Sequence, residues 1–341
     1  MLMNDNEYLE ILERVKALIV SARHRAALAL NHEVIEAYWR TGAEINQHRE
    51  WGNRFIENLS RDLRTAFPGI TGYSRRNLWY MAQFAEAYPE SEIVQRFVAQ
   101  IPWGHNTTLL DKVSDPEQRQ WYAEATLANG WTRDVLALQI DTHLYQRQVT
   151  ATKTANYEDR LPPPQGELAL QGLKEPYVFD IMADPITAKE RQVEDAMVAN
   201  VTKMLLELGT GFAFIGQQYH LEVEGEDFYV DLLFYHLKLR CYVVVELKAT
   251  KFKPEFAGKL NFYVSAVDAM LRTETDQPTI GILLCRDKRG LVAEFSLKDI
   301  EKPIGVSEYK LLSEWPEGYA DLLPSAEDLS RRVEFDPDGE A

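Results

Sequence analysis

The sequence contains little of what disulfide-bonded, zinc-binding and membrane proteins need. Its 341 residues include two cysteines, Cys241 and Cys285, which lie far apart in apolar segments and indicate buried, reduced thiols. The seven histidines have no metal-ligand spacing with one another or with a cysteine, which argues against zinc. There is no run of about 20 apolar residues and no secretory signal pattern. We therefore expect a cytoplasmic protein without a membrane segment.

Basic residues are also scarce. The 37 lysines and arginines against 53 aspartates and glutamates give a net charge of −16. Residues 1–150 hold 16 basic and 19 acidic side chains, a net −3, and residues 151–341 hold 21 and 34, a net −13. Nucleic acids bind to a local basic surface, whatever the total charge of the protein. The shortage of basic residues therefore weakens the case for a nucleic-acid partner without excluding one.

Three consecutive prolines, Pro162–Pro164, interrupt every periodic pattern near the middle of the chain. Proline can neither continue a helix nor pair inside a sheet, so this region predicts a linker or a surface loop over residues 151–175. On either side we expect a helical domain at 1–150 and an α/β domain at 176–325, followed by an acidic tail at 326–341.

Apolar residues at helical spacing dominate the first domain, together with residues that cap or stop helices. Ser74 is a suitable N-terminal cap for one helix, and Asn129-Gly130 is a suitable stop for another. These signals predict an all-α domain with helices over 8–49, 54–66, 74–88, 116–129 and 132–148.

A short Gly/Pro turn joins the second and third of these helices, as in a helix-turn-helix. The third helix opens with Arg75, Arg76 and Asn77, whose polar side chains suit contacts to phosphates or bases at the start of a recognition helix. An ordinary helical hairpin with a solvated basic first turn explains the same residues, and both interpretations stay open.

The second domain alternates between helical and strand patterns. Its order is helix, three strands, helix and strand, an α-β-β-β-α-β arrangement that predicts a three-layer α/β fold. The expected elements are a helix at 187–208, strands at 212–223, 228–236 and 240–249, a helix at 254–271 and a strand at 279–285.

Charged residues interrupt the apolar strands of this domain at three positions. Glu246 and Lys248 lie two residues apart in the third strand, so their side chains share a face at the end of the apolar run Cys241–Val245. Asp231 lies on the preceding strand and can approach Glu246 across a hairpin. Isolated buried charge costs about several kcal/mol, so these groups need partners. A cross-strand ion pair would provide them, and so would a metal site.

Two converging carboxylates without a Cys/His cluster form a hard-oxygen site that suits Mg²⁺, with Mn²⁺ as a substitute. Lys248 beside them could hold the attacking water and stabilise the charge of a phosphoryl transition state. Glu194 falls on the apolar stripe of the preceding helix, where an acid needs a partner. It is either a third metal ligand or a first-turn glutamate that the helix dipole favours.

At these residues the sequence resembles the YhcG-like family of bacterial nucleases in the PD-(D/E)xK superfamily. The resemblance rests on Asp231-Leu-Leu-Phe-Tyr-His, Val245-Glu-Leu-Lys and Phe252-Lys-Pro-Glu-Phe-Ala-Gly-Lys-Leu-Asn-Phe-Tyr, and in the first domain on Gly72-Tyr-Ser-Arg-Arg-Asn-Leu and Gly130-Trp131. It implies a restriction-endonuclease-like fold and Mg²⁺-dependent phosphodiester hydrolysis. It also implies that Asp231 and Glu246 bind the metal and that Lys248 is catalytic.

One position departs from that family pattern. Many exonuclease-like members place Q-x-x-x-Y on the second core helix, where this sequence has Lys259-x-x-x-Tyr263. The lysine could still meet a phosphate, and we therefore count Lys259 with Arg75, Arg76 and Asn77 as candidate nucleic-acid contacts. The departure favours an endonuclease over an exonuclease.

Two functions from different classes are compatible with these features. The chain could be an active nuclease that cleaves DNA, with a helical domain that binds DNA, a protein partner or a second copy as a homodimer. It could instead be a non-catalytic DNA-binding or protein-interaction module on a nuclease-like fold. The complete set of Asp231, Glu246 and Lys248 favours the nuclease, because a decayed site has no reason to keep buried charge.

Overall fold

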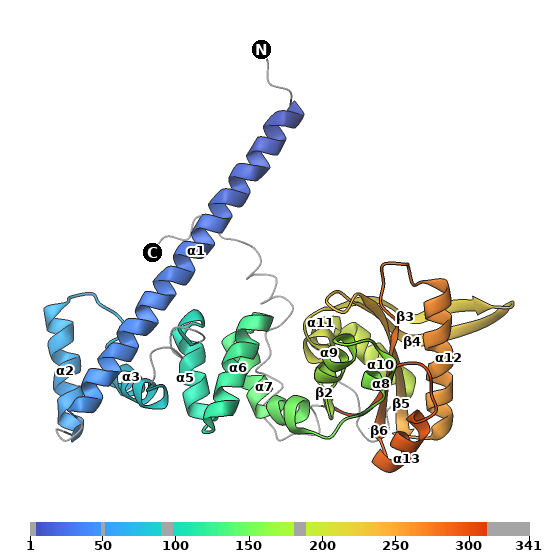
Figure 1. Cartoon of the computed structure of the whole chain (residues 1–341). Coiled ribbons are helices and arrows are strands. Elements are labelled where there is room, and N and C mark those ends of the chain that lie inside the picture. The colour runs from blue at the N-terminus through green and yellow to red at the C-terminus, as the bar shows by residue number, and fades with distance from the viewer. Residues whose placement is uncertain (1–4, 49–51, 90–97, 181–188, 312–341) are drawn as a thin grey trace. The chain divides into compact units, whose positions relative to one another are not determined.

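The computed structural model describes residues 5–48, 52–89, 98–180 and 189–311 of the chain (Figure 1). The chain divides into two compact units, residues 1–140 and 141–341, and each is described by itself below. The acidic tail that we expect at 326–341 lies outside the described residues. In the described ranges no helix combines the length and the apolar character that a membrane span requires.

The first unit is helical, as the sequence predicts. The region 8–49, expected to form two helices or one long bent helix, forms one long helix. The helix α5 was not predicted, because its Gly104, Asn106 and Thr107 are weak helix formers. The helices are α1 (Asp5–Gln47), α2 (Gly52–Ala66), α3 (Arg75–Ala87), the 3-10 helix η2 (Val98–Gln100), α5 (Trp103–Lys112), α6 (Pro116–Asn129) and α7 (Arg133–Asp141).

Two predicted helix boundaries are confirmed in atomic detail. Ser74 Oγ accepts a hydrogen bond of 3.2 Å from the backbone N–H of Asn77 and so caps α3. Gly130 closes α6 with a φ of 62°, the left-handed conformation in which glycine carries no steric cost. The last helix, α7, ends at Asp141 and not near 148, because His143 has a left-handed backbone with a φ of 55°. The chain then forms a short π-helix, η3 (Gln146–Thr150).

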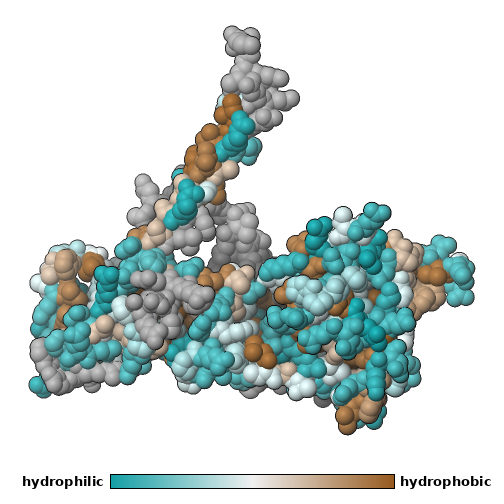
Figure 2. Space-filling view, in the orientation of Figure 1, coloured by the Kyte–Doolittle hydropathy of each residue, from teal (hydrophilic) through white to brown (hydrophobic). Residues whose placement is uncertain are grey.

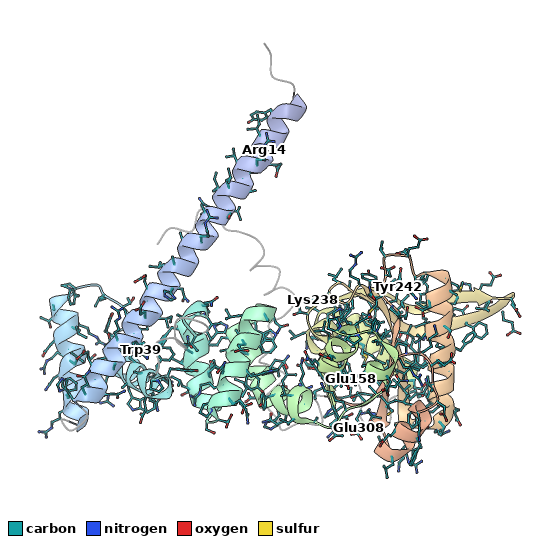
Figure 3. The ribbon with its side chains drawn as sticks, viewed as in Figure 1. Arg14, Trp39, Glu158, Lys238, Tyr242 and Glu308 are labelled. Atoms are coloured by element: carbon teal, nitrogen blue, oxygen red, sulfur yellow. The ribbon has the colours of Figure 1, made fainter. Side chains whose placement is uncertain are left out.

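The C-terminal part of α1 packs against α3. Ile45, Leu78 and Met81 share one buried apolar cluster, and a Cβ atom on Gly42 would overlap the backbone of Met81, so the two helices can approach closely only with glycine at this position. Trp39, labelled in Figure 3, donates its Nε1–H to the Tyr88 carbonyl at 2.7 Å. The N-terminal part of α1 instead carries exposed apolar side chains, including Val15, Leu18 and Ile19 (Figure 2).

The second unit is built on a seven-stranded mixed sheet. The strand order is β1-β7-β6-β5-β4-β3, and β2 pairs with β7 beside that path. The pairs β3–β4 and β4–β5 are antiparallel, whereas β5–β6 and β6–β7 are parallel. The strands are β1 (Thr154–Ala155), β2 (Tyr177–Phe179), β3 (Phe212–Val223), β4 (Glu226–His236), β5 (Cys241–Lys251), β6 (Ile280–Asp287) and β7 (Ile304–Leu311).

Helices cover both faces of this sheet and bury its apolar residues in two cores. Val193, Met204 and Val245 belong to the core under α10 and α11, and Val244 and Leu260 belong to the core under α12 and α13. The predicted α-β-β-β-α-β order is confirmed, although the first helix is divided in two at Asn200. The helices are α8 (Tyr157–Arg160), α9 (Gln165–Gly172), α10 (Glu190–Ala199), α11 (Val201–Leu208), α12 (Pro254–Met270) and α13 (Gly290–Leu297).

Residues 151–175 differ from the linker that the prolines predict, because they are folded onto the sheet. Thr154 pairs with Val306 in the β1–β7 ladder. The side chain of Asn156 donates to the carbonyls of Ile300 and Lys302, both at 3.1 Å, and accepts the N–H of Ile304 at 2.7 Å. These partners lie about 150 residues further along the chain. No local pattern could therefore reveal them.

We predict that Asn156→Ala destabilises the second unit by about 3 kcal/mol, because it leaves buried carbonyl and N–H groups without partners. The melting temperature of that unit, followed by far-UV circular dichroism, should fall by roughly 6–12 °C. Six of the seven tryptophans lie in residues 1–140, so the transition followed by tryptophan fluorescence should not move.

The exposed Asn129 on α6 provides a matched control, and Asn129→Ala should shift neither transition by more than about 2 °C. If Asn156→Ala melts at the same temperature as Asn129→Ala, the Asn156 contacts do not stabilise the sheet.

Candidate active site

The three charged residues of the predicted cluster lie together at the end of the central hairpin. In the β4–β5 ladder Leu232 pairs with Val245, which places Asp231 beside Glu246, and Asp231 Oδ2 accepts the Leu247 N–H at 2.9 Å. Lys248 Nζ lies 3.0 Å from Glu246 Oε1 and 3.9 Å from Asp231 Oδ2. The separation of these two oxygens cannot exceed the sum of the two distances. Both carboxylates therefore face the same ammonium group, that of Lys248.

Glu246 is fully buried, with 0 % of its side chain exposed, and its two oxygens have different surroundings. Oε1 accepts a 2.5 Å hydrogen bond from Lys259 and contacts Lys248. Oε2 is buried without a hydrogen-bond partner among the described residues. Burial, and then the charge of Asp231, raise the pKa of Glu246, while the two lysines oppose that rise. Buried carboxylate oxygens rarely lack a partner, so Oε2 marks a position where a further cation or donor fits.

Lys248 is held by a third carboxylate that the sequence did not reveal. Glu190, the first residue of α10, contacts Lys248 Nζ at 3.1 Å and accepts the Ala249 N–H at 3.3 Å. Burial alone would lower the pKa of Lys248, but Glu246, Asp231 and Glu190 together raise it above the ordinary value. Lys248 is therefore an ammonium group at neutral pH. An acid at a helix start is so common that Glu190 gave no distinctive signal.

Glu194 reaches the cluster through a second residue that was not predicted, Gln218 on β3. Gln218 Nε2 lies 3.0 and 2.9 Å from the two oxygens of Glu194 and 3.2 Å from Asp231 Oδ1. Burial raises the pKa of Glu194, and Asp231 adds to the rise against the hydrogen bond from Gln218. The polar pair Gln217-Gln218 inside a strand was the available signal. Gln218 holds two like-charged side chains near each other.

Gln218 achieves this contact with an unusual backbone. Its φ is 47°, in the left-handed region, although it lies inside a strand between the ladder pairs Gln217–Leu232 and Tyr219–Val230. A residue other than glycine costs about 1–2 kcal/mol in that region. Such local strain is found where the side chain must be held in a particular position.

Lys259 is part of the same cluster and lies on α12. Besides its bond to Glu246, its Nζ lies 5.0 Å above the centre of the Tyr263 ring. The side chain is 44 % exposed, so it can be reached from solvent. The family position at which this sequence departs from Q-x-x-x-Y therefore carries a cation beside the buried carboxylate.

Arg75, Arg76 and Asn77 belong to the first unit. Arg75 and Arg76 are exposed, and Arg76 also contacts the Tyr80 hydroxyl at 3.4 Å. The Asn77 side chain differs, because its amide forms hydrogen bonds within the unit. Its oxygen accepts the Trp103 Nε1–H at 2.6 Å, and its nitrogen donates to the Gly72 carbonyl. Contact between the Asn77 amide and a nucleic acid would have to break these bonds.

The side chains around Lys248 suit a hard divalent cation, although the described residues contain no ready-made group of three metal-binding side chains. The donors are all carboxylates, which Mg²⁺ and Mn²⁺ prefer. The four acids Asp231, Glu246, Glu194 and Glu190 face the two lysines Lys248 and Lys259, which leaves two formal negative charges. One divalent ion would balance that charge, and Glu246 Oε2 is the oxygen that has no other partner.

Comparisons with known proteins cover both units. A YhcG PDDEXK nuclease domain matches residues 170–324, and a DUF1016 N-terminal domain matches residues 14–147. Both units are thus similar to those of the YhcG-like family. Asp231, Glu246 and Lys248 all lie inside the nuclease-domain match. The second unit is therefore a nuclease-type domain with the restriction-endonuclease-like fold that the sequence predicts.

Two individual proteins are similar to this chain. The Escherichia coli (strain K12) protein YhcG, which is named as a candidate nuclease, is 27 % identical over 340 residues, or 89 % of this chain and 90 % of that protein. A crystal structure of a repair endonuclease from Pyrococcus abyssi is 21 % identical, covers 38 % of this chain and 49 % of that chain, and has a TM-score of 0.26. A TM-score this low supports no argument about function.

Glu246 and Glu190 form a matched pair for a stability test, because both contact Lys248 but only Glu246 is buried. The Glu190 side chain is 42 % exposed. In EDTA we predict that Glu246→Gln destabilises the second unit by about 3 kcal/mol, since it leaves buried lysine charge without its partner. Glu190→Gln should cost less than about 1 kcal/mol, because water screens an exposed pair. Circular dichroism melts that show equal losses would contradict the buried pairing.

Proposed function

We propose that this protein is a metal-dependent nuclease that hydrolyses phosphodiester bonds of DNA. The observation that carries the proposal is the fully buried Glu246, which has one unpartnered oxygen and lies beside Asp231 and Lys248 within a nuclease-type domain. A solvent-exposed salt bridge does not require a buried oxygen that lacks a hydrogen-bond donor. A metal site does, because the metal ion takes the place of the donor.

In this proposal Asp231 and Glu246 hold Mg²⁺, or Mn²⁺ in its place, with Glu194 as a third ligand. A bound divalent ion lowers the pKa of a water molecule and stabilises charge on the phosphate oxygens. Lys248 has the complementary role. Its carboxylate neighbours favour the protonated form, so it can stabilise the anionic attacking oxygen and the transition state.

The substrate contacts in this proposal come from both units. Lys259 is partly exposed beside Glu246 and can exchange that partner for a phosphate of the substrate. Arg75 and Arg76 are exposed on α3 and are available to a phosphate backbone, whereas the amide of Asn77 is engaged. Lys259 in place of the glutamine of exonuclease-like relatives supports cleavage within a strand over cleavage from an end.

One observation favours a second candidate, a non-catalytic nucleic-acid-binding or protein-interaction module. Lys248 and Lys259 already neutralise Glu246 without any metal, as a structural ion pair would. The two candidates differ in their response to a divalent ion, and both experiments below distinguish them.

We predict cleavage of nucleic acid that requires Mg²⁺ and stops in EDTA. Asp231→Asn, Glu246→Gln and Lys248→Met should each lower kcat by at least about 10²-fold, because each removes a charge that acts on the reacting phosphate. Lys251 lies three residues along the same strand with an exposed side chain, so Lys251→Met is the matched control and should retain activity. The assay uses a panel of single-stranded, duplex and branched DNA together with RNA.

Undiminished cleavage in EDTA, or an active Asp231→Asn variant, would refute this mechanism. The substrate of the panel that is cleaved fastest would define the preference for DNA or RNA.

We also predict that Mg²⁺ raises the melting temperature of the second unit. Saturation at 100 times the dissociation constant stabilises a folded protein by about 2.7 kcal/mol. Asp231→Asn should lose most of this gain, while Asn129→Ala on the first unit should keep it. The measurement is a circular dichroism melt in MgCl₂ against NaCl of the same ionic strength. A gain of equal size in the wild type and in Asp231→Asn would show that Asp231 does not bind the ion.

A further inference from the structure

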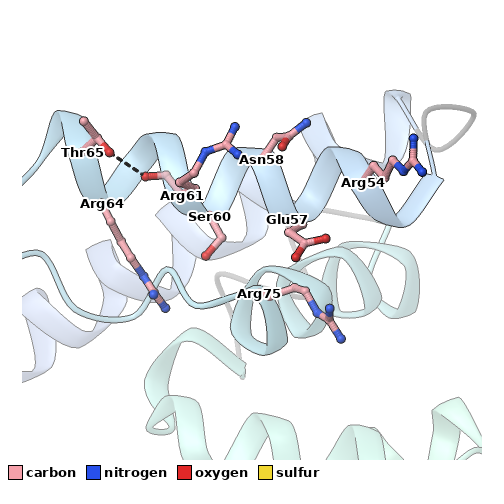
Figure 4. Close-up of a pocket in the computed structure, with 8 residues that line it drawn as sticks. All are labelled: Arg54, Glu57, Asn58, Ser60, Arg61, Arg64, Thr65 and Arg75. Carbon is pink, nitrogen blue, oxygen red and sulfur yellow. Dashed lines mark hydrogen bonds between the residues drawn. The ribbon is translucent and has the colours of Figure 1, made fainter.

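The first unit contains a cavity of about 720 Å³ whose walls are rich in arginine (Figure 4). Arg54, Arg61 and Arg64 come from α2, and Arg75 comes from the start of α3. Glu57 is the one acidic side chain among the lining residues. We call this space the arginine cavity. With four arginines and one glutamate it carries a local charge of +3, within a chain whose net charge is −16.

The sequence of α2 places these arginines together. Phe55, Ile56, Leu59 and Leu63 pack against the apolar cluster beneath the helix. Arg54 and Arg61 are seven residues apart, which is close to two helical turns, and therefore lie on the opposite side of α2. The amphipathic pattern that holds α2 on the unit thus also presents its arginines to the cavity.

Most of this positive charge is not neutralised within the protein. Within the described ranges Arg54, Arg64 and Arg75 have neither an ion pair nor a hydrogen-bonding partner. The Arg61 guanidinium forms an ion pair with the exposed Asp62, at 3.1 Å. Like charges gathered around one concave surface raise its electrostatic potential and attract anions. An anionic ligand would therefore be bound here more strongly than on the rest of this acidic chain.

We propose that the arginine cavity binds the phosphodiester backbone of a nucleic acid. This inference rests on the proposed nuclease function and names the surface that holds its substrate. Arg54 and Arg64 are ten residues apart, or about 15 Å along the helix axis, so a ligand with several phosphates matches their spacing better than a single phosphate does. A nucleic-acid strand carries a charge about every 3.4 Å along its axis and can contact the whole row. The planar guanidinium group also binds phosphate oxygens through two parallel hydrogen bonds.

The test compares variants that remove the same charge inside and outside the cavity. Arg54→Gln/Arg64→Gln removes two arginines that have no partner, so the fold should be unaffected. Arg23→Gln/Arg25→Gln removes two exposed arginines of α1 that do not line the cavity. Arg54→Lys/Arg64→Lys keeps the charge. Binding to labelled duplex DNA, single-stranded DNA and RNA of one sequence is measured by fluorescence anisotropy in EDTA, over a series of salt concentrations.

We expect Arg54→Gln/Arg64→Gln to weaken binding at least 10-fold at physiological salt. It should also reduce the slope of log K against log[salt] by up to about 2 units. Arg23→Gln/Arg25→Gln should bind as the wild type does, and Arg54→Lys/Arg64→Lys should keep the salt slope. The labelled probe that shows the largest loss identifies the backbone as that of duplex DNA, single-stranded DNA or RNA.

Equal losses in the two glutamine variants would overturn the inference, and so would unchanged binding in Arg54→Gln/Arg64→Gln. A wild type that binds none of the three probes but binds polyglutamate would also overturn it and would indicate an acidic protein partner. Because binding is measured without a divalent ion, failure of the proposed catalysis is detected separately, as a wild type that does not cleave in Mg²⁺.

Discussion

The burial of one carboxylate, that of Glu246, determines the arrangement around the central strand of the second unit. β5 is apolar on both faces, and burying a charge at its end is unfavourable unless other charges surround it. Each neighbouring element provides one of these charges. β4 brings Asp231, α12 brings Lys259, and Lys248 of β5 itself is held by Glu190 of α10. The same contacts therefore connect the helices on both faces of the sheet to one position on one strand.

The charge of the chain is divided in a way that fits this arrangement. Carboxylates gather in the second unit, where a metal ion can balance them, and unpaired arginines gather around the arginine cavity of the first. An acidic site repels a polyanion that comes within the screening length of about 8 Å at physiological salt. In the proposed mechanism, a separate basic surface would hold a phosphate backbone without placing further lysines among the carboxylates, where they would compete with the metal ion.

Local patterns in the sequence were sufficient for much of this structure. Alternation along β5 placed Glu246 and Lys248 on one face, and helical spacing placed Glu194 on the buried side of α10. The residues that were not predicted depend on distant segments. Glu190 resembles any first-turn acid, and the role of Gln218 depends on a left-handed backbone that no side-chain pattern encodes. Thr154 and Asn156 were assigned to a linker because their partners in and before β7 lie some 150 residues away.

The left-handed backbone of Gln218 lowers stability, but it positions the side chain that assembles the site. A glycine there would relieve the strain of the left-handed backbone. It would also remove the amide that holds Glu194 and Asp231 near each other against their mutual repulsion. A substitution that relaxes the backbone at this position would therefore tend to separate the two carboxylates. We therefore expect glutamine to be retained at this position only while selection acts on the function of the site.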